Sequence, residues 1–273
     1  MTNNRVVAII KTKNIRAEGR INDIPVVLLE FEEADSPVAV PINHCIVQGN
    51  NSVSFYLQIG NSPSSTETCS IINAEMEASG GTLSFSADIV ICGEDDSIFS
   101  DDTEQLLRYT WLGGMAPKTF RIDREIFLKN SYGILPWQRA EVIGALTPIM
   151  ADQVFRYLLE LHRLLSKGQI ALFMEHTQQK LKEMLEISYG ASYEPFCQGM
   201  TERIREVVED TNWKLLPLEL SDMDFRLVGN GRLIDCLRRN WQPALHFCMK
   251  DSPDSYSLPV KIGRLDGRWK ILA

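Results

Sequence analysis

The hydrophobic period of the chain changes near residue 130, and this change constrains the fold more than any other feature. Before it, short runs of β-branched and aromatic residues are separated by turn residues about every 8–12 positions. The clearest run is SVSFYLQIG (52–60), in which four apolar side chains alternate with other residues. This pattern is typical of a β-sandwich or jelly roll. We therefore expect residues 1–130 to form an all-β, jelly-roll-like sandwich domain.

The expected strands in this first domain are bounded by glycine, asparagine and proline. Pro37 and Pro41 place their strand at a sheet edge or end, because proline cannot donate a ladder hydrogen bond. Gly80-Gly81 indicates a hairpin between the last two strands. Residues 106–135 have no clear period and are not assigned. The expected strands lie at 6–10, 16–23, 24–31, 37–44, 52–60, 70–78 and 82–91.

From 131 to 273 the period is first helical and then strand-like. Apolar residues at three- and four-residue spacing predict helices at 151–168, 170–190 and 194–209. From Trp213 onward the pattern predicts antiparallel strands, which end in a hairpin whose turn is Asp266-Gly267. We expect residues 131–273 to form an α+β domain with three helices packed on an antiparallel sheet.

The segment before these helices also has a helix-like pattern. It begins with Pro136 in a plausible first turn, and we expect Pro148 to end it. The apolar residues that would share one face of this run are Trp137, Ala140, Val142, Ile143 and Leu146.

Two parts of the chain resemble known families. The S-K-G-Q break between two helices and the ending V-x-I-x-R-L-D-G-R-W-K-I-L resemble the cone-shaped fold of nuclear transport factor two and the SnoaL-like polyketide cyclases. This resemblance covers 150–273 and implies a cone-like domain, in a family that includes enzymes, adaptors and binding modules. INDIPV and INHCIVQGNNSVSFYL resemble jelly-roll accessory domains. The residues that match the cone-fold ending are Val260, Ile262, Asp266, Gly267, Trp269, Lys270 and Ile271.

The net charge of −8 is concentrated in the first half of the chain. Residues 1–130 hold ten Lys and Arg against eighteen Asp and Glu, whereas residues 131–273 hold eighteen of each. Between Arg20 and Arg108, a stretch of 87 residues contains fifteen acids and no Lys or Arg. A surface of one sign repels phosphate backbones and attracts basic proteins. We therefore expect no nucleic-acid binding and a basic protein partner; an acidic, soluble domain without a specific partner is the alternative.

The densest part of this stretch is EDDSIFSDDTE (94–104), where six of eleven residues are acidic. Calcium sites commonly use alternating carboxylates with a glycine turn, whereas these acids come in adjacent pairs interrupted by apolar residues. We expect a docking surface for the basic partner, with a solvated loop as the alternative. The expected binding residues are Glu94, Asp95, Asp96, Asp101, Asp102, Glu104, Ile98 and Phe99.

Motifs for catalysis are absent from the sequence. It has no Gly-rich phosphate loop, no nucleophile elbow and no H-E-x-x-H. We expect no cofactor and no metal site. A cone-fold enzyme would need an acid/base pair, for which Asp235 and His246 are the candidates. Asp235 shares an apolar-leaning strand face with Leu233 and Leu237, whereas we expect His246 to point outward.

These observations favour a non-enzymatic interaction protein over a small-molecule enzyme. A bacterial immunity or antitoxin-type protein that masks a basic effector has this profile, and so has an adaptor for a secreted protein. No apolar run approaches the roughly 20 residues of a membrane helix, and none of the six cysteines forms a CxxC pair. We expect a cytoplasmic protein without a membrane segment. An exposed edge strand would also allow a homodimer.

Overall fold

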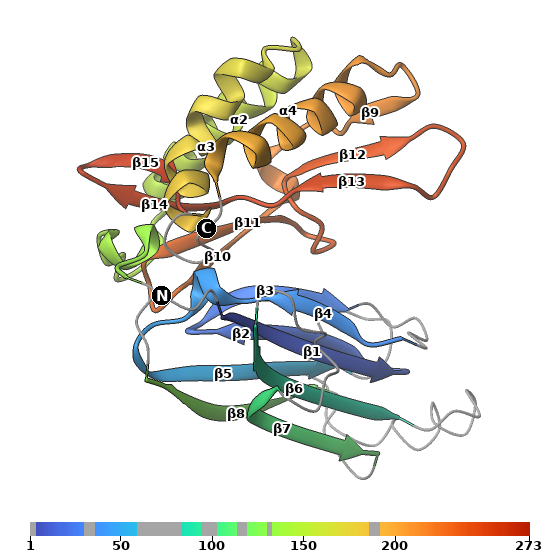
Figure 1. Cartoon of the computed structure of the whole chain (residues 1–273). Helices are drawn as coiled ribbons and strands as arrows, with labels where there is room; N and C mark the ends of the chain where they lie inside the picture. Colours follow the sequence, from blue (N-terminus) through green and yellow to red (C-terminus); the bar gives the residue numbers. More distant parts are fainter. Residues whose placement is uncertain are drawn as a thin grey trace. The chain divides into compact units, whose positions relative to one another are not determined.

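The computed structural model describes residues 4–29, 36–58, 83–93, 103–113, 119–129, 133–185 and 192–273 (Figure 1). The chain forms two compact units, Met1–Gly133 and Ile134–Ala273. The first unit is built of strands, and the second combines helices with strands.

Two four-stranded antiparallel sheets make up the described part of the first unit. One has the strand order β4-β1-β6-β7 and the other β3-β2-β5-β8. The short β4 lies at a sheet edge, as its prolines predict. The strands are β1 (Arg5–Lys13), β2 (Arg16–Ile21), β3 (Ile24–Leu29), β4 (Val38–Pro41), β5 (Gly49–Gln58), β6 (Ser84–Cys92), β7 (Glu104–Leu112) and β8 (Thr119–Leu128).

Apolar side chains from the two sheets meet between them. The rings of Phe55 on β5 and Phe85 on β6 are buried, with their centroids 5.0 Å apart. A Cβ added to Gly19 on β2 would lie 3.2 Å from Cδ1 of Ile10 on β1. Two sheets that bury their facing side chains in this way form one core, which is what the alternating strands predict.

Strands β7 and β8 occupy much of the segment that the sequence left unassigned. In β8 the inward positions Phe120, Ile122 and Ile126 alternate, but Arg124 interrupts them. The Arg124 guanidinium lies 4.6 Å from the ring centre of Tyr109 on β7, so this charge is accommodated on an aromatic face. A charged, exposed residue at an otherwise apolar position therefore interrupts the period of this strand. The expected strand at 70–78 and the Gly80-Gly81 hairpin lie outside the described residues.

Three helices pack together in the second unit and share one apolar core with its strands (Figure 1). They are α2 (Pro148–Ser166), α3 (Ile170–Met184) and α4 (Tyr193–Glu209). The core includes Leu158 and Leu161 of α2, Phe173 of α3 and Ile204 of α4. Phe196, in the first turn of α4, is 45% exposed.

The strands of this unit form two antiparallel sheets, ordered β10-β11-β14-β15 and β13-β12-β9. Asp266 and Gly267 both have positive φ at the turn between β14 and β15, as the predicted hairpin requires. The strands are β9 (Trp213–Leu215), β10 (Met223–Val228), β11 (Leu233–Arg238), β12 (Leu245–Met249), β13 (Ser255–Leu258), β14 (Lys261–Leu265) and β15 (Arg268–Ile271).

The prediction of a helical run from Pro136 to Pro148 is wrong. Only a 3₁₀ turn forms, over Pro136–Arg139, and Val142 on the expected buried face is 63% exposed. The backbone N–H groups of Glu141 and Ile143 donate instead to Arg264 O and Gly231 O. Pro148 begins α2, where its missing N–H costs nothing, and Thr147 Oγ1 caps the helix by accepting from Met150 N.

The described chain is thus strand-built in its first unit and mixed α+β in its second. Among the helices it describes, none is long and apolar enough to cross a membrane.

Candidate functional site

The acidic segment 94–104 is mostly outside the described residues. Of the eight expected binding residues only Glu104 is described, as the first residue of β7, where it is exposed and pairs in register with Ile91 of β6. Glu94, Asp95, Asp96, Ile98, Phe99, Asp101 and Asp102 all fall in the segment between β6 and β7.

Four acids carried by strands and tight turns of the first unit form ion pairs with arginines: Glu18, Asp23, Asp88 and Asp123. Asp88 Oδ1 accepts from Arg108 Nε over 2.9 Å. Arg20 donates from Nε to Glu18 Oε1 over 2.5 Å and from Nη1 to Asp23 Oδ1 over 2.9 Å. Arg20 and Arg108 are the two residues that border the Lys/Arg-free stretch. They therefore compensate charge on the sheets themselves.

Most of the remaining acids lie between strands. Twelve of the fifteen acids between Arg20 and Arg108 fall in 30–35, 59–82 and 94–102, and these three segments contain no Lys or Arg. The strand registers show where the segments begin and end. Leu29 and Gln58 lie opposite the start of β2, and Val38 and Ser84 lie opposite the C-terminal half of β1. The flanks of 30–35 and 59–82 are therefore at the same end of the sheets.

The described residues that precede 94–102 lie at the opposite end of the sheets. Cys92, the last strand residue before this segment, pairs with Arg5 at the start of β1. The Arg5 guanidinium also donates to Gly93 O over 3.2 Å, next to the segment. The described flanks of the three acidic stretches thus lie at two ends of the first unit, and the residues just before the densest stretch lie at the end where β1 begins.

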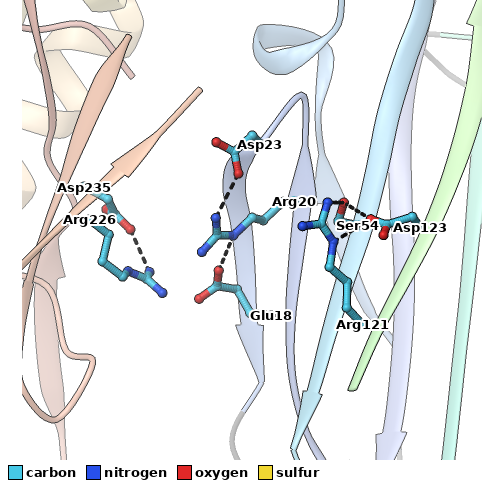
Figure 2. Close-up of polar contacts among 8 residues, drawn as sticks. All are labelled: Glu18, Arg20, Asp23, Ser54, Arg121, Asp123, Arg226 and Asp235. Carbon is cyan, nitrogen blue, oxygen red and sulfur yellow. Dashed lines mark hydrogen bonds and ion pairs between the residues drawn. The ribbon is translucent and has the colours of Figure 1, made fainter. Parts of the chain in front are cut away.

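A polar cluster that sequence reasoning missed lies on one face of the β3-β2-β5-β8 sheet (Figure 2). Its residues occupy two adjacent rows across β2, β5 and β8, because Glu18, Tyr56 and Arg121 are successive partners, as are Arg20, Ser54 and Asp123. The Tyr56 ring lies between two guanidiniums, with Arg20 at 4.6 Å and Arg121 at 5.0 Å from its centre. Such cation–π contacts contribute roughly 0.5–2 kcal/mol each.

Hydrogen bonds connect the outer part of this cluster. Ser54 Oγ donates to Asp123 Oδ1 over 2.7 Å, and Arg121 Nε donates to the same oxygen over 2.6 Å. The bond from Ser54, together with Arg121, lowers the pKa of Asp123. Burial opposes the charged form of Arg20, but Glu18 and Asp23 raise its pKa overall. The cluster contains two guanidiniums and three carboxylates that compensate one another, so it provides little net charge for recognising a partner.

Asp235, a candidate in the enzyme interpretation, is buried beside an arginine. Only 4% of the residue is exposed. Its Oδ2 accepts from Arg226 Nη2 over 2.9 Å (Figure 2). The guanidinium of Arg226 also lies 5.1 Å from the ring centre of Trp241. Ile234 and Cys236, on either side of Asp235, belong to the helix-facing core, so strand alternation places Asp235 on the other face of β11.

His246 has a different partner. The expectation that it points outward is wrong, since only 2% of it is exposed. Its Nδ1 lies 2.6 Å from Oγ of Ser257, the residue opposite it on β13. Burial, with a contribution from the nearby Arg238 charge, lowers the pKa of His246. The hydrogen bonds of the described residues join Asp235 to Arg226 and His246 to Ser257, rather than the two to each other.

A second polar cluster surrounds the backbone of Leu216. Leu216 O accepts from Arg238 Nη2 over 3.1 Å and lies 3.0 Å from Nε2 of His162, while Leu216 N donates to His246 O over 2.9 Å. Arg238 Nη2 also donates to Pro217 O and Ala244 O. The cluster joins α2 to β11 and β12, which lie far from it in sequence and share no pattern with it.

Metal ligands do not gather in the described part of the chain, where no group of three or more His, Cys, Asp or Glu could hold an ion. Comparisons with protein-family models, curated proteins and solved structures found no match. Function is therefore inferred from the residues and their contacts.

Proposed function

We propose that the chain is a non-enzymatic interaction module whose N-terminal unit binds a basic protein partner through residues 94–104. One observation carries this proposal. Four of the six described acids of the first unit are ion-paired with Arg20, Arg108 or Arg121, whereas twelve further acids belong to three stretches of sequence that contain no Lys or Arg.

We propose residues 94–104 as the binding segment because acidic residues are densest there. It carries six acids in eleven residues, together with Ile98 and Phe99. Carboxylates steer a basic partner over about a Debye length, roughly 8 Å at physiological salt. Apolar side chains at the centre of an interface contribute most of the affinity once they are desolvated. The segment therefore combines long-range attraction with an apolar anchor.

The chemistry of the partner follows from the segment. A partner with clustered Lys or Arg beside an apolar pocket would complement it, as expected for a basic effector masked by an immunity or antitoxin-type protein, or for the cargo of an adaptor. The alternative of a cone-fold enzyme gains no support from Asp235 or His246, because the described hydrogen bonds join Asp235 to Arg226 and His246 to Ser257, and not the two candidates to each other.

The experiment compares the wild-type chain with a variant in which all six acids of 94–104 become their amides. A control variant neutralises six exposed acids of the second unit: Glu160, Glu175, Glu202, Glu219, Asp251 and Asp266. Each chain is used as bait in native lysate, and captured proteins are identified by mass spectrometry at low and high salt.

The proposal predicts one dominant basic protein, captured by the wild type and the control variant at low salt and lost from the 94–104 variant. Capture of the same proteins by all three chains, or of acidic proteins by the wild type, would contradict it. The control has the same net charge as the test variant, so a loss confined to the latter reports the position of the acids.

A further inference from the structure

We infer that the cluster around Leu216 in the second unit binds a small oxyanion, a carboxylate or a phosphate, between Arg238 and His246. The inference concerns the second unit alone and is independent of the proposed partner of the first. It begins from a buried positive charge. Arg238 is only 8% exposed, and its hydrogen bonds in the described structure go to the carbonyl oxygens of Leu216, Pro217 and Ala244.

Carbonyl oxygens compensate this charge only in part. Buried charges in proteins are normally paired with an opposite charge, because desolvating an unpaired ion is costly. Asp222 acts electrostatically on Arg238, but its side chain is exposed. Burial dominates and lowers the pKa of Arg238. The site therefore favours an additional negative group.

Two buried nitrogen atoms of the cluster have no hydrogen-bond partner within the described residues. They are Nε of Arg238 and Nε2 of His246. The Arg238 atom is a donor at all accessible pH. Nε2 of His246 is a donor in the tautomer in which the hydroxyl of Ser257 donates to Nδ1, and in the protonated ring it is a donor whichever way that bond runs. Two donors without acceptors, beside a buried cation, call for a ligand that only accepts hydrogen bonds.

Backbone contacts place the Arg238 guanidinium beside the chain segments that flank His246. Arg238 Nη2 donates to Ala244 O over 3.2 Å, two residues before His246. Leu216 N donates to His246 O while Leu216 O accepts from Arg238. The Arg238 charge also lowers the pKa of both His162 and His246. An oxyanion at the site would reverse this effect, because it would stabilise the protonated form of each ring.

His162 is the half-buried side of the cluster. Its Nε2 lies 3.0 Å from Leu216 O, so the neutral ring carries its proton there, and its Nδ1 lies 3.3 Å from Ser166 Oγ. The N–H donor of His162 is therefore already used by Leu216 O. We assign it a supporting role, as a reporter of the electrostatic potential and not as a direct ligand.

The test is an NMR titration of the histidine rings of the full chain with inorganic phosphate and, separately, with acetate. Ionic strength is held constant with chloride. The inference predicts that the pKa values of His246 and His162 rise with a single dissociation constant for at least one of the two anions. His44 and His176, which lie elsewhere in the chain, serve as internal controls and should not follow that curve.

Two variants make the result specific. His246→Asn keeps a group that can bond Ser257 in place of Nδ1 but removes Nε2, and Arg238→Lys keeps the charge but removes Nε–H. Each should weaken anion binding at least about tenfold, the loss expected for one charge-assisted hydrogen bond. Thermal unfolding monitors whether the variants fold, and His176→Asn is the matched control, with unchanged binding.

Three outcomes would overturn the inference. The rings of His246 and His162 could be insensitive to both anions across the millimolar range. Both folded variants could bind with wild-type affinity. An experimental structure in phosphate could show only an ordered water hydrogen-bonded to Arg238 Nε and His246 Nε2. A dependence on phosphate but not acetate, or the reverse, would identify the class of anion.

Discussion

The guanidinium of Arg226 and the carboxylate of Asp235 lie 2.9 Å apart on neighbouring strands of the second unit, with Trp241 stacked against the arginine. This relationship gives the most conspicuous buried acid of the chain a structural partner. Breaking a buried ion pair by removing one side leaves the other charge uncompensated, at a cost of about 3–5 kcal/mol. We predict a loss of unfolding free energy of this order for Asp235→Ala, measured by urea denaturation.

The exposed Asp251 provides the control for this variant, since Asp251→Asn should change stability by no more than about 0.5 kcal/mol. An Asp235→Ala protein as stable as the control would show that the pair contributes nothing and would return Asp235 to the functional candidates.

Stability should depend on pH through His162 and His246. The folded-state pKa of each is lowered, principally by burial, so the unfolded chain binds protons more readily than the folded chain. The two histidines therefore make their full contribution to the free energy of unfolding above their pKa in the unfolded chain, roughly 6.5. This contribution is lost as the pH falls through their pKa values in the folded chain. We predict that the urea concentration at the unfolding midpoint decreases as the pH is lowered below this value.

The double variant His162→Gln/His246→Asn tests the origin of that slope. Glutamine can replace the Nε2 bond to Leu216 O, and asparagine the Nδ1 bond to Ser257, without titrating. Its urea midpoint should vary less with pH below 6.5 than that of the wild type. Equal slopes in the two proteins would assign the acid sensitivity to other groups.

Asn51 holds the turn that enters β5. Its Oδ1 accepts from Val47 N and from Asn22 Nδ2, and its Nδ2 donates to Val47 O and Gly49 O, all within 3.0 Å. Asn51→Ala leaves these buried groups without partners, so it should lower the unfolding free energy by at least about 1–3 kcal/mol. Asn50→Ala, on the exposed neighbour, should be close to neutral in the same thermal unfolding experiment. Equal losses would contradict the role of the amide.

Two glycines in the second unit should respond to alanine in opposite directions. A Cβ on Gly263 would lie 2.6 Å from Leu272 Cδ1 and 3.0 Å from the backbone oxygen of Arg232. Gly263→Ala should therefore destabilise the unit by about 1–3 kcal/mol. A Cβ on Gly199, inside α4, would meet nothing within 4 Å, so Gly199→Ala should stabilise by about 0.5–1 kcal/mol. Urea denaturation measures both, and a stabilising Gly263→Ala would refute the close packing of β14.

Local patterns predicted those elements that depend on their own residues. The β14–β15 hairpin follows from the dipeptide Asp266-Gly267, which adopts the positive φ values that its turn needs. The helix α2 follows from the spacing of Val154, Leu158, Leu161 and Leu165, all of which are buried. Long-range contacts determine the conformation of the segment before α2, where the N–H groups of Glu141 and Ile143 donate to carbonyl oxygens that are distant in sequence. No window of sequence contains that information.

The two polar clusters could not be predicted from local sequence at all. Arg20, Tyr56 and Arg121 come together only through the registers of β2, β5 and β8. His162, Arg238 and His246 come together through the packing of α2, β11 and β12 around Leu216. Counting charged residues located the Lys/Arg-free stretch, because the composition of a stretch does not depend on the fold. The counts did not reveal that Arg20 and Arg108, which border the stretch, form ion pairs with its acids Asp23 and Asp88.

The central claim is that residues 94–104 recruit a basic partner, and the salt dependence of the association rate tests it most directly. The partner captured by the wild type is purified, and its association rate is measured between low and physiological salt. For the wild type and the control variant we predict a fall of at least about tenfold, as for electrostatically steered encounters, and for the 94–104 variant a slow, nearly salt-independent rate. Equal rates and equal salt dependence in all three chains would contradict the account.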